Sequence, residues 1–257
     1  FNIDNNAHQV KIIGNTFDHL SSIGLDLIAP YPWMSGPPMT NVLVKGNVFS
    51  DVGYGTSYAA AIYLDNSGSN IVVEDNVVRD SSVGIAVNVE PYYGPFITKY
   101  VIVRRNLVSN SRYYNLKIGS GGSGDDCVST MNGYVVNDSV MVHNTSFYGT
   151  GYTGTSNGFG CGSNNRWKNN IFAHLNSANS SQYMVWPTSI ATMAATWQLD
   201  YNFFQPAGTN WFYWLGTFYN SLAAFQAGSG QDTHSLTGDP LFVNAAARDF
   251  DLQAGSP

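Results

Sequence analysis

The chain has 257 residues, of which only 11% are charged, and its formal net charge is −6. This length suits one all-β unit or two smaller domains, and the scarcity of lysine and arginine argues against a nucleic-acid-binding surface. No apolar run reaches the roughly 18 residues that cross a bilayer, so we expect neither nucleic acid nor a membrane as a partner.

Polar residues that favour turns, chiefly Asn, Gly, Ser, Thr and Tyr, dominate the composition, which is typical of a secreted or cell-surface β-rich protein. The chain opens at "FNIDNN" without a methionine, and we expect it to be a trimmed piece of a longer protein. Cys127 and Cys161 are the only cysteines. They can form a disulfide in an oxidising compartment or remain two free thiols. We expect a monomer.

An eight-residue pattern recurs along the chain as "VKIIGNTF", "VLVKGNVF", "IVVEDNVV" and "VIVRRNLV". Each copy alternates apolar and variable positions before an asparagine and has an apolar residue two positions after it. Period-two alternation predicts a strand that enters the asparagine and a short strand that leaves it. With three weaker later copies, the asparagines are Asn15, Asn47, Asn76, Asn106, Asn144, Asn170 and Asn202.

A second apolar pair follows later in each repeat, at Leu25/Leu27, Ile62/Leu64, Ile85/Val87 and Leu116/Ile118. Three short strands in about 30 residues describe one coil of a parallel β-solenoid, whose inward residues stack on those of the next coil. Stacked asparagines can bond along the axis, because each amide both donates and accepts. We therefore predict an all-β parallel β-helix whose coils occupy residues 1–214.

Residues 215–257 are expected to cap the same domain, since the open edge of a solenoid needs cover. "YNSLAAFQAG" places Leu222 and Phe225 on one face of a short helix, with Ser or Asn as its start cap and Gly228 as its stop. This helix and a "DPLFV" strand are predicted to cover the last coil.

Polar residues follow the outward positions of the strand that carries the second apolar pair. They are Asp26, then Tyr63 and Asp65, then Asn88 and Glu90, then Lys117. Long loops follow this strand, and their aromatic residues suit stacking on sugar rings in a polysaccharide groove. From these loops we select Trp33, Tyr92 and Tyr93 as substrate-binding residues, and from the strand region we add Tyr63, Arg112 and Tyr114.

Two segments carry a resemblance to a known family, "GIAVNVEPYYGPFITKYVIVRRNLVSNS" and "NLKIGSGG". They resemble secreted right-handed parallel β-helix proteins of the pectate lyase-like superfamily. The second segment resembles the strand that carries the base in one pectate lyase family. The resemblance implies that Lys117 removes the proton in a β-elimination on a uronate-containing glycan.

Ca²⁺ can neutralise the uronate carboxylate, and its expected ligands are Asp65, Asn88 and Glu90. Two other functions remain open. A glycoside hydrolase would pair the Glu90 carboxylate with Asp65 or Asp26. A non-catalytic glycan-binding or structural β-helix module would need neither Lys117 nor Glu90 for chemistry.

Overall fold

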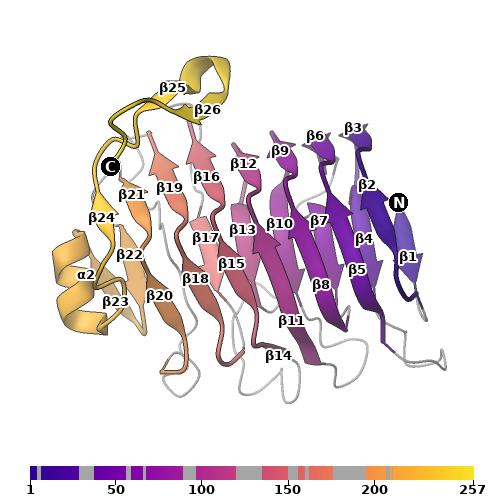
Figure 1. Cartoon of the computed structure of the whole chain (residues 1–257), viewed down its shortest axis with the longest axis horizontal. Helices are drawn as coiled ribbons and strands as arrows, with labels where there is room; N and C mark the ends of the chain where they lie inside the picture. The colour runs from indigo at the N-terminus through magenta and orange to yellow at the C-terminus, as the bar shows by residue number, and fades with distance from the viewer. Residues whose placement is uncertain are drawn as a thin grey trace.

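The computed structural model describes residues 1–4, 7–28, 38–55, 59–65, 68–88, 97–119, 135–149, 156–159, 162–175, 195–206, 209 and 211–257. These residues form an all-β structure in which three parallel sheets run side by side along the long axis (Figure 1). The predicted parallel β-helix is thus confirmed. No helix in these ranges has the length and apolar character needed to cross a membrane.

The three sheets take their strands from successive coils. Sheet A contains β1 (Asn2–Asp4), β4 (Leu25–Ile28), β7 (Ala60–Asp65), β10 (Val83–Asn88), β13 (Tyr114–Ile118) and β17 (Ser156–Phe159). Sheet B contains β2 (Lys11–Ile13), β5 (Thr40–Lys45), β8 (Ser69–Glu74), β11 (Ile97–Arg104), β14 (Val135–Asn137), β15 (Val140–Val142), β18 (Arg166–Lys168) and β20 (Gln198–Asp200). Sheet C contains β3 (Thr16–Leu20), β6 (Val48–Val52), β9 (Val77–Arg79), β12 (Leu107–Ser109), β16 (Thr145–Tyr148), β19 (Ile171–His174), β21 (Phe203–Gln205) and β24 (Leu236–Thr237).

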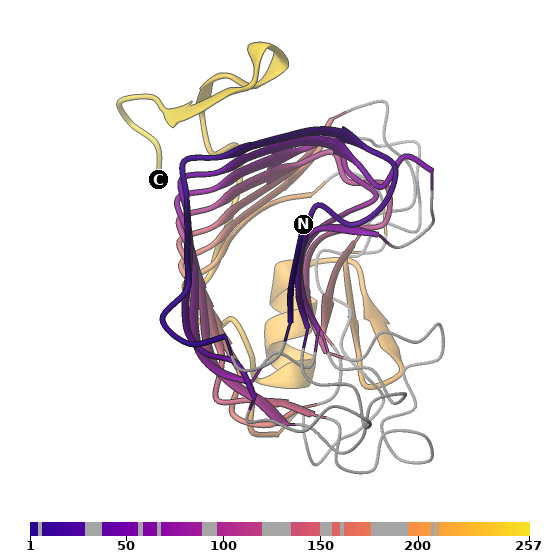
Figure 2. The same ribbon diagram turned by 90° about the vertical axis from the view of Figure 1, so that its right-hand side faces the viewer.

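The coils wind in the right-handed sense. Seen from the N-terminal end, the chain runs clockwise through sheets B, C and A as it recedes (Figure 2). Sheets B and C meet at the corner that holds the repeating asparagines, and sheet A faces sheet B across the interior. The outer face of sheet A therefore points away from the core.

The repeating asparagines form the predicted ladder inside this corner. The Asn47 backbone N–H and side-chain Nδ2 both donate to Oδ1 of Asn76, at 2.9 and 3.0 Å. The same two bonds recur in each step from Asn15 to Asn202. Six of the seven side chains are 0–2% exposed, so the ladder satisfies amide groups that no water reaches.

The residue before each ladder asparagine has a left-handed backbone, with φ between 52° and 69°. Glycine takes this conformation without strain and occupies the position twice. Elsewhere a side chain occupies it and is carried to the outside of the corner. These outward residues are Asp75, Arg105, His143, Asn169 and Tyr201.

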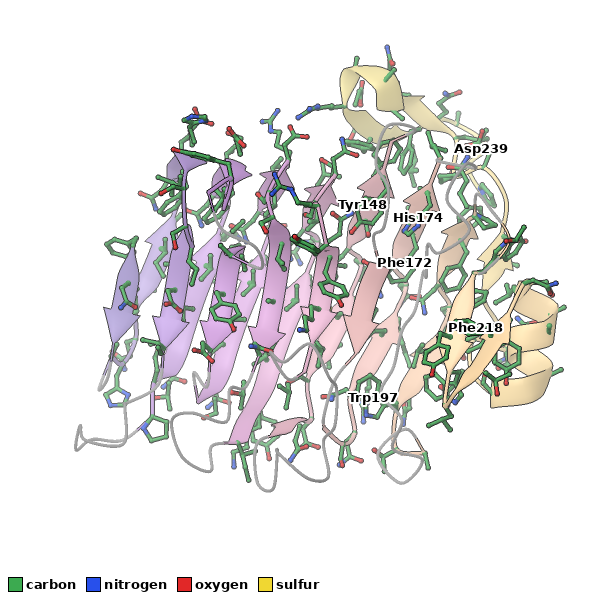
Figure 3. All side chains as sticks on the ribbon, turned by 180° about the vertical axis from the view of Figure 1, so that it is seen from behind. Tyr148, Phe172, His174, Trp197, Phe218 and Asp239 are labelled. Atoms are coloured by element: carbon green, nitrogen blue, oxygen red, sulfur yellow. The ribbon has the colours of Figure 1, made fainter. Side chains whose placement is uncertain are left out.

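Apolar rows fill the interior in the predicted register. Leu27, Leu64, Val87 and Ile118 are aligned by strand pairing and are each 0% exposed. Aromatic rings take over toward the C-terminal end, where Phe172 stacks on Trp167 at 5.7 Å and on Phe204 at 5.4 Å between ring centroids. Figure 3 labels Phe172 within this interior.

The predicted helix is present as α2 (Leu222–Ser229), and it lies across the C-terminal end of the interior (Figure 2). Ser221 is its N-cap and accepts from the N–H of Ala224. Gly228 was expected to end the helix but lies within it. Gly230, with φ 69°, is the C-cap, because it takes the left-handed conformation that closes the last turn.

The "DPLFV" segment does not cover the last coil as predicted. It forms β25 (Phe242–Asn244), which continues through the 3₁₀ turn η1 (Ala245–Ala247) into the antiparallel β26 (Asp249–Leu252). This hairpin lies on the outside of sheet C (Figure 1), where Phe242 and Phe250 pack on Phe147. The C-terminal end of the β-helix is closed instead by α2 and by the hairpin of β22 (Phe212–Trp214) and β23 (Thr217–Tyr219). The two are joined by Phe212, which stacks on Phe225 at 4.4 Å between ring centroids.

Candidate functional site

The outer face of sheet A presents one row of side chains from successive coils. Strand pairing aligns Asp26 with Tyr63, Tyr63 with Ala86, and Ala86 with Lys117. Their neighbours in each strand point into the core, so all four side chains point outward. Adjacent strands lie about 4.8 Å apart, which separates the Cα atoms of Tyr63 and Lys117 by roughly 10 Å.

Lys117 is half-buried in this row, and its Nζ lies 5.3 Å from the centroid of the Tyr114 ring. This distance is within the range of a cation–π interaction. Gly158 pairs with Lys117 on the next strand, and a Cβ at Gly158 would lie only 3.2 Å from the Tyr114 ring. The absence of a side chain at Gly158 therefore leaves space for the ring beside the lysine.

A second polar row lies two residues farther along the strands. Asp65 and Asn88 are paired in register and are 2% and 1% exposed. The Asn88 Nδ2 donates to the Tyr63 hydroxyl at 2.5 Å, which links this row to the first. This bond fixes the position of the Tyr63 hydroxyl relative to Asn88.

Asn88 Oδ1 is buried and has no hydrogen-bond partner within the described ranges. Together with the adjacent Asp65 it offers carboxylate and amide oxygens, the donor types that Ca²⁺ prefers, but Ca²⁺ takes six to eight ligands. No cluster of three or more His, Cys, Asp or Glu side chains suited to a metal occurs among the residues with described positions. These two residues alone do not make a calcium site.

An apolar cluster lies beside the polar rows on the same face. Ala60, Val83 and Ala86 are buried, and Tyr63, Tyr113 and Tyr114 pack against them. Tyr113 did not stand out in the sequence, because it precedes the strand and no repeat aligns it with the other tyrosines. The face thus combines three phenol rings with one lysine and a buried amide.

Of the other residues predicted for the site, one lies at a corner, two are carboxylates on sheet A, and the rest lie outside the described residues. Arg112 is exposed at the corner before β13, and its backbone N–H donates to the carbonyl of Ser81. Asp26 and Asp65 lie on adjacent strands, two positions out of register, which places their Cα atoms roughly 8 Å apart. Trp33, Glu90, Tyr92, Tyr93, Cys127 and Cys161 lie outside the described residues.

His143 is exposed on the corner between sheets B and C. It borders two adjoining cavities of about 380 and 310 Å³, and residues of β26 line the opposite side of both. Sequence spacing alone cannot indicate these cavities, since they form only where the C-terminal hairpin folds back on the coils.

A buried aromatic pair was also missed at the end of sheet C. Tyr148 and His174 are 0% and 1% exposed, and their rings meet edge to face at 4.7 Å between centroids (Figure 3). They are aligned by the pairing of β16 and β19. They occupy the last positions of these strands, beyond the region where the repeat pattern is clear.

No family model, curated protein or solved structure matches the chain.

Proposed function

We propose that this protein is a secreted or cell-surface carbohydrate-active β-helix protein that cleaves a uronate-containing glycan by β-elimination. The observation that carries the proposal is the alignment of Tyr63 and Lys117 in one outward row, with the Tyr63 hydroxyl held by Asn88. Side chains from three coils therefore face the same side of sheet A. The resemblance of "NLKIGSGG" to the base-carrying strand of pectate lyases supports the same assignment.

In this reaction Lys117, as the neutral amine, removes the proton on the carbon next to the uronate carboxylate. The electron pair of that C–H bond forms the C4–C5 double bond. The C4–O bond breaks, and its electron pair leaves with the oxygen. Tyr63 lies in the same outward row as Lys117, and its hydroxyl, which accepts from Asn88, faces the side on which a sugar or leaving oxygen would lie.

The uronate carboxylate needs a positive charge beside it for the adjacent C–H bond to become acidic. Arg112 is exposed near β13 and can present a planar pair of donors to a carboxylate. Ca²⁺ held by Asp65, Asn88 and Glu90 would be the alternative source of charge. Among the described residues, Asp65 and Asn88 alone supply fewer oxygen ligands than the six to eight that Ca²⁺ takes.

The test is incubation with pectate, alginate and related uronate polymers, with and without Ca²⁺, while ultraviolet absorbance reports unsaturated ends. Lys117→Met is expected to abolish product formation. Lys99→Met is the matched control, because Lys99 also lies over a tyrosine, 5.4 Å from the Tyr100 ring, but on sheet B. Absence of unsaturated product from every polymer tested, or full activity of Lys117→Met, would refute the proposal.

A non-catalytic glycan-binding module is the second candidate, favoured by the apolar cluster at Ala60, Val83 and Ala86. Tyrosine rings over small apolar residues suit stacking on sugar faces without any chemistry. Glycan binding that survives Lys117→Met, without turnover, selects this function. Release of reducing ends without ultraviolet absorbance would instead indicate a glycoside hydrolase that uses Glu90 with Asp65 or Asp26.

A further inference from the structure

A groove runs along the corner between sheets B and C, beside the C-terminal hairpin. It consists of the two adjoining cavities of about 380 and 310 Å³, and the side chains that line both are His143, Thr145, Phe250 and Asp251. Because the same side chains border both cavities, these are two parts of one groove. Each volume lies in the range of small-molecule pockets, about 300–1,000 Å³.

Two rows of outward side chains from successive coils form the floor of this groove. One row lies at the corner and consists of residues that directly precede ladder asparagines, Arg105, His143 and Asn169. The other row lies on sheet C, where strand pairing aligns Leu107 with Thr145 and Thr145 with Ile171. Adjacent coils are about 4.8 Å apart, so the floor extends roughly 10 Å along the axis.

Strand β26 forms the wall of the groove and runs along the same axis. Its first residue, Asp249, lines the cavity that contains Arg105, and its last residue, Leu252, lines the cavity that contains Asn169. At about 3.4 Å per residue, the four residues of β26 cover roughly the same 10 Å as the floor. The wall and the floor are therefore matched in length.

Contacts within the chain hold this wall in place. Arg248 Nη1 lies 2.6 Å from Asp80 Oδ2, a contact that joins the start of β26 to a much earlier coil. Phe250 packs on Phe147 at 4.7 Å and on Phe242 at 5.3 Å between ring centroids. The Phe250 ring stays half-buried and lines both cavities, so it presents a fixed aromatic surface of the kind that stacks on sugar rings.

The charged groups of the groove balance one another. The lining contains two guanidiniums and two carboxylates, those of Arg105, Arg248, Asp249 and Asp251. Both guanidiniums also bond to carboxylates outside the lining, as Arg105 Nε does to Asp75 at 2.7 Å. An anion would therefore meet positive charge that is already compensated, and a cation would meet two guanidiniums. A neutral ligand with groups that both donate and accept suits such a lining.

His143, which borders both cavities, has hydrogen-bonding capacity in reserve. It is exposed, and its ring makes no hydrogen bond to any residue within the described ranges. A neutral imidazole donates at one nitrogen and accepts at the other, and the hydroxyl of Thr145 does both. Sugar hydroxyls also donate and accept, so they can use either group.

We propose that this groove binds a neutral oligosaccharide, with one sugar ring against Phe250 and sugar hydroxyls bonded to His143 and Asp251. The groove lies at the corner between sheets B and C and is separate from the outer face of sheet A. The inference therefore does not depend on the proposed cleavage of a uronate polymer. An acidic sugar fits this groove less well, because Asp249 and Asp251 repel its carboxylate.

The test follows the proton resonances of the His143 ring by NMR while neutral sugars are added, namely cellotetraose, xylotetraose, mannotetraose and maltotetraose. The spectrum of His143→Gly assigns these resonances. At least one sugar is expected to shift the His143 signals saturably. It should leave the signals of His234 unchanged, an exposed histidine on a later coil that lines neither cavity.

Two variants, measured by calorimetry with the sugar that binds, each remove one polar partner. His143→Gly deletes the imidazole and introduces the residue that earlier coils carry at the equivalent position, Gly14 and Gly46. This variant and Asp251→Ala should each bind about tenfold more weakly, the equivalent of about 1.4 kcal/mol. His234→Ala is the matched control and should bind as the wild type does.

The proposal is overturned if no sugar of the panel shifts the His143 signals, or if both groove variants bind as tightly as the wild type. It is also overturned if tetragalacturonate at the same concentration shifts the His143 signals more than every neutral sugar. Loss of neutral-sugar binding in Lys117→Met would overturn it as well, since that result would place the sugar on sheet A.

Discussion

Asn106 donates its side-chain Nδ2 to Oδ1 of Asn144 at 3.0 Å, across 38 residues of sequence. The same nitrogen donates to the carbonyl of Val73 at 2.9 Å, and Asn106 Oδ1 accepts two bonds from Asn76. One buried side chain therefore ties three coils together. Backbone bonds between coils flank it, since the Arg105 N–H donates to the carbonyl of Val142 at 3.3 Å and the Leu107 N–H to that of Asn76 at 2.9 Å.

Replacing Asn106 with alanine should lower the free energy of unfolding by about 2–4 kcal/mol, because buried donors and acceptors on two neighbouring coils lose their partners. Asn15→Ala is the matched control in the same ladder. It should cost less than about 1 kcal/mol, since Asn15 is exposed and water can replace its bonds. Urea denaturation followed by circular dichroism measures both. Equal losses in the two variants would show that burial of the ladder is not what stabilises it.

Asp232 accepts the last side-chain bond of the ladder, from Asn202, beside Ser235, which stands in register where a further asparagine would be. Asp232 is 0% exposed. Its Oδ1 accepts from Asn202 and Ser235, while Oδ2 is buried with no partner among the described residues. Burial raises the pKa of this carboxyl from 3.8 to about 6. The protonated form is thus favoured by folding, so its stabilising contribution is present below about pH 4 and is lost as the pH rises through about 6.

Asp232→Asn removes this titration. Relative to the variant, the wild-type protein should lose up to about 3 kcal/mol of stability between pH 4 and pH 8, which is the equivalent of a shift of about two pKa units. Denaturation at a series of pH values measures the difference. Asp251→Asn, at an exposed position of β26, controls for the loss of one carboxylate. A constant difference between wild type and Asp232→Asn across this range would contradict the assignment.

Glu74 is the centre of a charged cluster on the outside of sheet B, although its side chain is only 7% exposed. Lys45 Nζ lies 2.9 Å from its Oε1, and Arg104 Nη2 lies 2.6 Å from its Oε2. Hydrogen bonds from Lys45 and then Arg104 lower the pKa of the Glu74 carboxyl. Its stabilising contribution is therefore present at neutral pH and is lost as the pH falls below about 4.3 toward the lower folded pKa.

Glu74→Gln should lower the free energy of unfolding by about 1–2 kcal/mol at pH 7, because charge-assisted hydrogen bonds become neutral ones. The deficit should shrink as the pH falls below about 4, where the wild-type carboxylate also becomes neutral. Asp75→Asn is the control, since this neighbouring side chain is 35% exposed and solvent screens its pairs with Lys45 and Arg105. A deficit that persists unchanged at pH 2.5 would mean that the amide disturbs packing rather than charge.

Sequence periodicity was sufficient to predict the stacked interior and the ladder. The spacing of Asn15, Asn47, Asn76 and Asn106 sets the coil length, and apolar residues at fixed offsets then fall into register. The Glu74 cluster could also have been anticipated, because Lys45, Glu74 and Arg104 occupy the same position in successive repeats. Because successive coils stack in register, residues at the same position of successive repeats come into contact.

The rest depends on contacts that the repeat does not encode. The hydrogen bond between Asn88 and Tyr63 runs diagonally between two rows, so a position-by-position comparison of coils does not reveal it. Likewise, nothing in "DPLFV" indicates that Phe242 packs outside sheet C, because that position depends on a match with Phe147 and Phe250. Segments outside the repeat are placed by tertiary packing alone.

Tyr63 offers a direct test of whether the outer face of sheet A is a functional site. Tyr63→Phe keeps the ring that packs on the apolar cluster but removes the hydroxyl that accepts from Asn88. We expect a loss of about 1 kcal/mol in stability, because the buried amide loses its acceptor. If the hydroxyl also contacts the glycan, kcat/KM on the active uronate polymer, or affinity for a bound glycan, should fall about tenfold or more. Tyr100→Phe, on sheet B and 50% exposed, should change neither stability nor activity. Wild-type activity and affinity in the Tyr63→Phe protein would show that the Tyr63 hydroxyl is not part of the site. The proposed site on sheet A would then rest on Lys117 without Tyr63.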